Sequence, residues 1–559
     1  MRREPFDADR GSTPDPSPTG QPAGEPAGAV AEPSAHSVSR RRFLAEAGAG
    51  AGSLAALAML GAGIPSSVAA QSSGAVGTLP TTLVPGAGGT LPPAPGGTPS
   101  AARLRPAAAA TVSPDLAAPV LTAGPGYRVD TNGWIYVHVE GDPYDRGFQH
   151  GQLVAPELAT IMRTLRHIMP IDTGQKWDYF VAAAERLYVP HREDEFLQEI
   201  KGIATGATKA GTDISWQEVL AWNGNMELTG YWYPGVLSGA YSDGVDNTHC
   251  SAFVATGSYT KDGKPVMAHN NWDHFVTGQF ANVILDIAPS SGHRMLMQAF
   301  PGYIASMTDY FVTDAGIMGT ETTIGSYTGY DPKRMAEFYR MRKATQYADS
   351  LDDWVRLMKK VNNGGYANSW LLADTNTGEI VRFELGLKYQ SVVRTGDGFY
   401  VGFNSAIDPR IRNLECGGDP TYFDTRTPAA CRRVRLTQLM EEQRGKIDPE
   451  VAKAVLSDHY DIYLDKADNP CSRTIEGHYE IDPFTYWQAR RPYSPQGALD
   501  GKVMDATMAK DMSFVARWGS SSGMPFDAAA YTAAHPQWDN VAGYLNDRPT
   551  QPWTLFRAG

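Results

Sequence analysis

The chain reads His249-Cys250-Ser-Ala-Phe-Val-Ala-Thr256 and, after the turn Lys261-Asp-Gly-Lys264, continues with Pro265-Val-Met-Ala-His-Asn-Asn-Trp-Asp273. Two short β-rich runs separated by a glycine-containing turn predict a β-hairpin over 251–269. Because an antiparallel hairpin returns to its starting level, the polar residues that follow the second run are expected beside Cys250. The sequence therefore predicts a thiol, amides and a carboxylate gathered at one end of a sheet.

On the C-terminal side of this hairpin, runs of strands alternate with runs of helices. This order is typical of an α+β fold, here two antiparallel sheets with helical layers outside. The strands are expected at 280–288, 294–300, 310–324, 368–375, 379–385, 389–394 and 398–403, and the helices at 332–346, 350–361 and 428–457.

On the N-terminal side, residues 123–249 are expected to be mostly helical. A strand is predicted over 133–139, and Asp142-Pro143 has the residue types of a helix N-cap and first turn. That helix is expected to reach about His167, and helical periodicity continues to residue 230.

Residues 1–70 have the features of an export signal. Ser39-Arg-Arg-Arg-Phe-Leu44 precedes an apolar run that ends in small residues at Val68-Ala-Ala70, which is typical of the twin-arginine route. A retained membrane anchor is the alternative. Residues 71–122, rich in Pro, Gly and Ala, are expected to form a disordered linker. We therefore expect a secreted or cell-envelope protein, with a weak association with the envelope.

Composition excludes several classes of protein. The 559 residues carry a net charge of −12, which argues against nucleic acid as a partner because phosphate binding needs clustered Lys and Arg. The 12 His are scattered and form no His-Glu-x-x-His motif, and the 4 Cys form no Cys-x-x-Cys pair. No metal and no cofactor are predicted.

Cys250 is the candidate nucleophile. A cysteine that opens a strand after a polar loop can become a chain terminus by self-cleavage, and its new α-amine, with a pKa of about 8, then serves as the base for the thiol. The alternative is a buried or disulfide-bonded cysteine. The amides and carboxylate of 270–273 are suited to hold an ammonium and stabilise an oxyanion, or they are ordinary turn residues.

Other candidates carry weaker expectations. Cys416 and Cys431 are close enough in sequence for a disulfide in an exported protein, which would leave Cys471 unbonded. Residues 519–523 fit the Gly-x-Ser-x-Gly pattern but lack the helix that a nucleophile elbow needs, so a Gly/Ser loop is favoured. His150 is expected to be structural.

Separated motifs resemble the self-processing N-terminal-nucleophile (Ntn) hydrolases of the acyl-CoA:penicillin acyltransferase (peptidase C45) type and their phospholipase B-like relatives. Phe300-Pro-Gly302 and Gly319-Thr-Glu-Thr-Thr-Ile-Gly325 are particularly similar to the phospholipase B-like branch. The other motifs are 141–151, 199–204, 249–253, 268–273, 366–370 and 469–473.

The resemblance implies a four-layer αββα sandwich with a helical N-terminal segment. It also implies cleavage between His249 and Cys250 into a small chain (123–249) and a large catalytic chain (250–559) that stay associated. The resemblance assigns roles to five residues: Cys250 as nucleophile, Asp273 as the contact of the new amino terminus, Asn270 beside the nucleophile, Asn368 at the oxyanion hole and Arg473 near the pocket. Thr313 falls near the place of a second oxyanion Asn and leaves that donor unassigned.

Three functions are compatible with these residues. The first is an exported, self-processing cysteine hydrolase that cleaves the amide bond of an N-acyl compound or small peptide through an acyl-thioester at Cys250. The second is a phospholipase B-like ester hydrolase, or an acyltransferase, on the same fold. The third is a catalytically silent envelope binding protein. The expected partners are an acyl amide or lipid-like small molecule and the chain's own cleaved fragment.

Overall fold

The computed structural model describes residues 120–238, 250–306, 310–484 and 492–559. The predicted export signal, almost all of the predicted linker and His249 lie outside the described residues. Among the described helices, none combines the length and apolar character needed to span a membrane.

The strands and helices come in the mixed order expected of an α+β protein. The strands are β1 (Leu121–Ala123), β2 (Gly126–Thr131), β3 (Trp134–Gly141), β4 (Ser251–Thr256), β5 (Val266–Asn270), β6 (Trp272–His274), β7 (Val283–Pro289), β8 (Met295–Ala299), β9 (Tyr310–Thr313), β10 (Ile317–Thr323), β11 (Asn368–Asp374), β12 (Ile380–Leu385), β13 (Gln390–Thr395), β14 (Gly398–Gly402), β15 (Gln496–Ala498), β16 (Asp500–Asp505), β17 (Ser513–Trp518) and β18 (Thr554–Arg557). The helices are α2 (Pro143–Leu153), α3 (Ala155–Thr173), α4 (Trp177–Tyr188), α5 (Asp194–Lys209), α6 (Trp216–Asn223), α7 (Asn225–Glu227), α8 (Tyr233–Ser238), α9 (Phe275–Gly278), α10 (Glu337–Tyr347), α11 (Leu351–Lys359), α12 (Pro409–Leu414), α13 (Pro428–Glu442), α14 (Pro449–Leu456), α15 (Ala506–Lys510) and α16 (Ala528–Ala534), with a π-helix at Leu228–Trp232 between α7 and α8.

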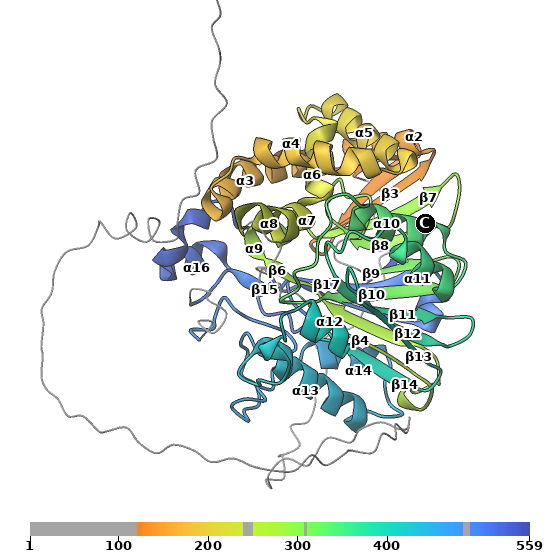
Figure 1. Cartoon of the computed structure of the whole chain (residues 1–559), viewed down its shortest axis with the longest axis vertical. Coiled ribbons are helices and arrows are strands. Elements are labelled where there is room, and N and C mark those ends of the chain that lie inside the picture. The colour runs from red at the N-terminus through yellow and green to blue at the C-terminus, as the bar shows by residue number, and fades with distance from the viewer. Residues whose placement is uncertain (1–119, 239–249, 307–309, 485–491) are drawn as a thin grey trace, which may run out of the picture. The chain divides into compact units, whose positions relative to one another are not determined.

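Within the described residues the strands form two large sheets and one small one. The ten-stranded sheet has the order β1-β2-β3-β7-β8-β9-β10-β11-β12-β13, the six-stranded sheet β14-β4-β5-β16-β17-β18, and β15 pairs with β6. Strands β4 and β14 contact β11 and β12, so the two large sheets face each other. Helix α11 contacts the ten-stranded sheet and α14 the six-stranded sheet, while Figure 1 shows α2 to α6 gathered together away from α13 and α14.

Several predicted boundaries are wrong for local reasons. The helix expected over 142–167 is two helices that break at Val154, and Pro156 lies in the first turn of the second helix, α3. The strand expected over 310–324 is a hairpin of β9 and β10, because Gly316 (φ +86°) turns the chain. The helix expected over 428–457 ends at Glu442, and Asp448 caps a second helix.

The sheets also differ from the prediction of two purely antiparallel sheets. Strand β3 pairs in parallel with β7, which requires a long crossover, and the chain supplies it with the helical segment and the β4–β5 hairpin. Strands β15 to β18 were not predicted. Of these, β16 and β17 are interior strands of the six-stranded sheet, where β16 pairs with β5.

The predicted Cys416–Cys431 disulfide is wrong. All four cysteines lie among the described residues, and none forms a disulfide. The Cys431 thiol, in the first turn of α13, donates to the carbonyl of Thr425 at 2.7 Å. Cys416 is buried beside Glu415 and Asp419, and burial together with these carboxylates raises the pKa of its thiol.

Helices α2 and α5 pack with their backbones in close approach. A Cβ added at Gly147 or Gly151 of α2 would lie within 3.0 Å of backbone atoms of α5, and one at Gly202 or Gly206 would meet the backbone of α2 in the same way. Three glycines of the motifs at 141–151 and 199–204, namely Gly147, Gly151 and Gly202, are therefore explained by packing of the N-terminal segment.

The same contact contains a buried ion cluster. Glu199 of α5 accepts from Arg146 Nε of α2 at 2.7 Å and from Arg342 Nη1 of α10 at 2.9 Å. All three side chains are at most 2% exposed. Glu199 thus joins the N-terminal helices to α10 in the second half of the chain.

Candidate active site

The β4–β5 hairpin places Cys250 beside Asn271. The predicted hairpin is confirmed, with Ser251 opposite Asn270 in the register. One step further along, Cys250 Sγ lies 4.0 Å from Asn271 Oδ1, and both residues are buried. The backbone N–H of Asn271 donates to Asp500 Oδ1 of β16 at 3.3 Å, which fixes the end of the hairpin against the neighbouring strand.

Asn271 has a further property that the sequence did not reveal. Its Nδ2 is buried and has no hydrogen-bond partner among the described residues. A buried amide donor without a partner costs about 1–3 kcal/mol, so such a group next to a thiol is a candidate donor to a reacting oxygen.

Asn270, which was expected beside the nucleophile, is used to hold loops. Its Nδ2 donates to the carbonyls of Leu456 at 2.8 Å and Ile475 at 3.2 Å, and its Oδ1 accepts from Ser521 Oγ. Of the two neighbouring amides, that of Asn271 is the one placed next to the thiol.

Arg432 of α13 holds the backbone of Cys250, and sequence reasoning missed it. Its Nη1 donates to the carbonyl of Cys250 and its Nη2 to Asn404 Oδ1 at 2.8 Å. Its guanidinium carbon lies 4.2 Å from the centre of the Trp272 ring, a cation–π arrangement, and the side chain is fully buried. No local pattern marks this arginine, because the cysteine that it contacts lies 182 residues away in the sequence.

Asp273 lies in β6 and lines a cavity of about 480 Å³. Its Oδ1 accepts from the backbone N–H of His274 at 2.6 Å. The pKa of Tyr303, which also lines the cavity, is raised by burial and by the nearby charge of Asp273. Cys250 is not among the described lining residues of this cavity.

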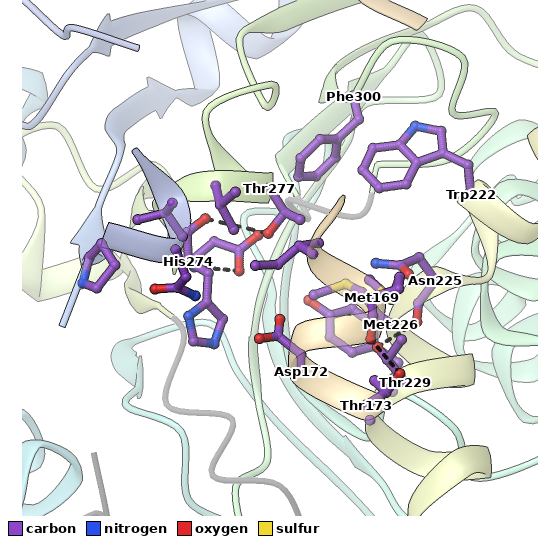
Figure 2. Close-up of a pocket in the computed structure, with 18 of the residues that line it drawn as sticks. Met169, Asp172, Thr173, Trp222, Asn225, Met226, Thr229, His274, Thr277 and Phe300 are labelled. Atoms are coloured by element: carbon purple, nitrogen blue, oxygen red, sulfur yellow. Dashed lines mark hydrogen bonds between the residues drawn. The ribbon is translucent and has the colours of Figure 1, made fainter. Parts of the chain in front are cut away.

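The cavity is lined mainly by apolar residues, several of them aromatic, and carries a second carboxylate. Figure 2 shows Trp222 and Phe300 on one side of the cavity, and Asp172 of α3 and His274 of β6 on the other. Asp172 is exposed at the surface, but the surrounding protein reduces the hydration of its carboxyl and raises its pKa to about 6, against a smaller opposing effect of His167. Such a cavity suits an apolar group with a few polar atoms.

Asn368 opens β11 behind this cavity. With its amide oriented to satisfy its neighbours, Nδ2 donates to Glu321 Oε2 at 2.7 Å and to the carbonyl of Ala367 at 3.0 Å. Tyr366, which lines the cavity, donates to the other oxygen of Glu321 at 3.2 Å. In this state the amide of Asn368 is bonded to Glu321, and Tyr366 connects that pair to the cavity.

Arg473 is placed in a buried ion pair. Its Nε donates to Asp461 Oδ1 at 3.2 Å and its Nη2 to Oδ2 at 2.5 Å, and it is not among the described lining residues of the cavity. Thr313 is buried at the end of β9 and does not line the cavity either.

The contacts of the 519–523 loop and of His150 support the structural roles that were predicted for them. In the 519–523 loop, Ser521 is bonded to Asn270, and the next helix, α16, starts only at Ala528, so the loop lacks the form of a nucleophile elbow. His150 is buried, its Nε2 accepts from the N–H of Gly302, and burial lowers its pKa to about 4, so it is a neutral structural residue.

Comparison with known proteins gives consistent matches to one group. A family model described as Phospholipase B matches residues 196–387, a range that contains Cys250, Asn270, Asp273 and Asn368 and leaves out Arg473. A protein of Archaeoglobus fulgidus named only "Uncharacterized protein" is 24% identical over 430 residues, which cover 66% of this chain and 68% of that protein.

Two named relatives match over shorter ranges. Phospholipase B of Crotalus adamanteus is 24% identical over 47% of this chain and 50% of its own length, and phospholipase B-like protein C of Dictyostelium discoideum is 21% identical over 58% and 63%. The chain thus spans about half to two thirds of the length of these two relatives. Over residues 196–387 it carries the sequence pattern of the phospholipase B family, and its similarities are to phospholipase B-like proteins.

Proposed function

We propose that the chain is an acyl hydrolase of the phospholipase B-like type whose nucleophile is Cys250, exposed by self-cleavage after His249. The observation that carries the proposal is the end of the β4–β5 hairpin, where the thiol lies beside an amide with an unpartnered donor. The family match encloses this hairpin and adds support.

Self-cleavage is the first step of the proposed chemistry. The thiol of Cys250 attacks the carbonyl carbon of His249, and the C–N bond breaks to give a thioester and a free α-amine on Cys250. Water then hydrolyses the thioester, which leaves a carboxylate on His249 and a thiol at the new amino terminus. Arg432 donates a hydrogen bond to the carbonyl of Cys250 and so holds the backbone on the C-terminal side of the bond that breaks.

Turnover uses the new amine as a base. The amine takes the thiol proton, the thiolate attacks the acyl carbonyl, and the leaving alcohol or amine departs with that proton. Water then attacks the acyl-thioester and releases the acid. The carboxylate of Asp273 is proposed to hold the amine, and Asn271 Nδ2 to donate to the oxyanion, a role the sequence resemblance gave to Asn368.

The proposal includes the fold of the Ntn hydrolases. Two facing sheets, with α11 on one and α14 on the other, support the four-layer αββα arrangement of the Ntn hydrolases. On this proposal residues 123–249 and 250–559 stay together as two chains after cleavage, and export by the twin-arginine route delivers the protein to the cell envelope or outside the cell.

The test compares two bond types on the processed protein. We expect two bands on a denaturing gel, the larger beginning at Cys250, and release of fatty acid from phosphatidylcholine vesicles. If acid is released faster from N-acyl amides than from phospholipid, amide hydrolysis replaces ester hydrolysis as the proposed reaction. Cys250 and its α-amine can cleave either bond. Absence of both activities in a processed protein would favour an envelope binding protein.

Asn271→Ala is expected to lower the rate without preventing folding. Removing one oxyanion donor typically costs about 10²–10³ in kcat. Because Asn271 Nδ2 has no described partner, the variant should keep the wild-type melting temperature. Acyl release is compared between Asn271→Ala and Asn282→Ala, whose amide is bonded to the carbonyl of Gly133 on the surface. Equal rates in the two variants would exclude Asn271 as the donor.

A further inference from the structure

Two histidines and a glutamate converge behind the candidate site. His459 Nε2 lies 2.6 Å from Glu476 Oε2, and His478 Nε2 lies 3.2 Å from the same oxygen. One ligand atom from each residue falls within 4.8 Å of the others. Glu476 is fully buried and His478 nearly so, while His459 is partly exposed.

The groups behind these three residues are arranged as in metal sites. His478 Nδ1, the nitrogen that faces away from the cluster, lies 2.8 Å from Glu480 Oε1. Glu476 Oε1 accepts from the backbone N–H of Ser522 at 2.7 Å. Metal-ligating histidines commonly donate their second ring N–H to a carboxylate, and ligating carboxylates are themselves hydrogen-bonded.

We propose that His459, Glu476 and His478 bind a divalent transition-metal ion, with zinc as the best-suited ion. Two imidazoles and one carboxylate form a set that zinc uses, whereas calcium and magnesium prefer oxygen ligands. Zinc bonds of about 2.0–2.2 Å in tetrahedral geometry place neighbouring ligand atoms roughly 3.5 Å apart. The two nitrogen–oxygen distances of 2.6 and 3.2 Å therefore need to lengthen by about 1 Å or less. The partly exposed side of His459 leaves room for a water as a fourth ligand.

The position of the cluster suggests a structural role. The carbonyl of Ile475, next to Glu476, accepts from Ser251 Oγ and Asn270 Nδ2 of the hairpin. Ser521, next to Ser522, donates to the same Asn270. An ion that joins the 459–478 segment would thus fasten two loops against the hairpin that carries Cys250.

The experiment titrates zinc chloride into the untagged, full-length protein after treatment with EDTA and dialysis, and follows heat release and melting temperature. We expect one zinc ion per chain and a higher melting temperature. His459→Gln, at the partly exposed ligand, should abolish both effects. Glu480→Gln, which keeps all three ligands, should weaken binding by about 10–100-fold.

His293→Gln is the matched control. His293 also lies between two carboxylates, with Nδ1 2.7 Å from Asp314 and Nε2 2.9 Å from Asp349, but outside the cluster. The His293→Gln variant should bind zinc as the wild-type chain does. No binding to the wild-type chain, or equal losses in His459→Gln and His293→Gln, would overturn the proposal. Circular dichroism of each variant separates lost binding from lost folding.

Discussion

Cys250→Ala is expected to remain a single uncut chain and to release no acyl product from phospholipid or from N-acyl amides. The same sulfur is required for self-cleavage and for turnover, so one substitution removes both. Loss of a nucleophile typically lowers the rate by about 10⁴-fold or more. The change from Cys to Ala removes one buried sulfur atom and should leave the hairpin folded. A denaturing gel, intact mass and acyl-release assays measure the result.

Cys416→Ala provides the control for this experiment. Cys416 is as buried as Cys250, at 3% against 2% exposed, and is likewise not in a disulfide. Its substitution should leave processing and activity at the wild-type level. Processing that continues in Cys250→Ala would place the cut elsewhere and would contradict the proposed nucleophile.

The hairpin could be predicted because its determinants are local. The strand 251–256 was predicted at its observed bounds, since β-branched and aromatic residues followed by a Gly turn fix both the type and the ends of this element. The same pattern placed Cys250 level with the amides at the end of β5. It could not show which amide faces the sulfur, because Asn270 and Asn271 are equivalent in composition and differ only in the face of the strand from which they project.

The remaining parts of the site depend on contacts between distant segments. Arg432 reaches Cys250 across 182 positions of the sequence, and Ser521 reaches Asn270 across 251. The His459–Glu476–His478 cluster has spacings of 17 and 2 residues, which match no metal motif. Strand β16 was missed because it begins with polar residues, such as Asp500 and Lys502, although both are fully buried and paired at 2.6 Å.

Glu199→Gln is expected to lower the free energy of unfolding by about 3–5 kcal/mol at pH 7, the usual cost of removing one partner from a buried ion pair. Arg146 keeps Glu195 at 2.8 Å, but Arg342 loses its only described carboxylate partner and stays fully buried. Urea unfolding measures the change. Glu157→Gln is the control, because Glu157 is 20% exposed and its partner Arg128 also pairs with Asp130, so a loss of about 1 kcal/mol is expected.

The pH dependence of the stability lost in Glu199→Gln distinguishes an effect of charge from an effect of packing. Burial alone raises the pKa of Glu199, but Arg146 and Arg342 outweigh burial and hold the pKa below its usual value. A carboxyl with a lowered pKa in the folded state stabilises the protein at pH values above the unfolded pKa of about 4.3, and this stability is lost as the pH falls through the folded pKa. The wild-type chain should therefore lose stability on acidification more steeply than Glu199→Gln, and the difference between them should shrink below pH 4. A difference that stays constant from pH 7 to pH 3 would mean that Glu199 acts by packing between α2 and α5, not by its charge.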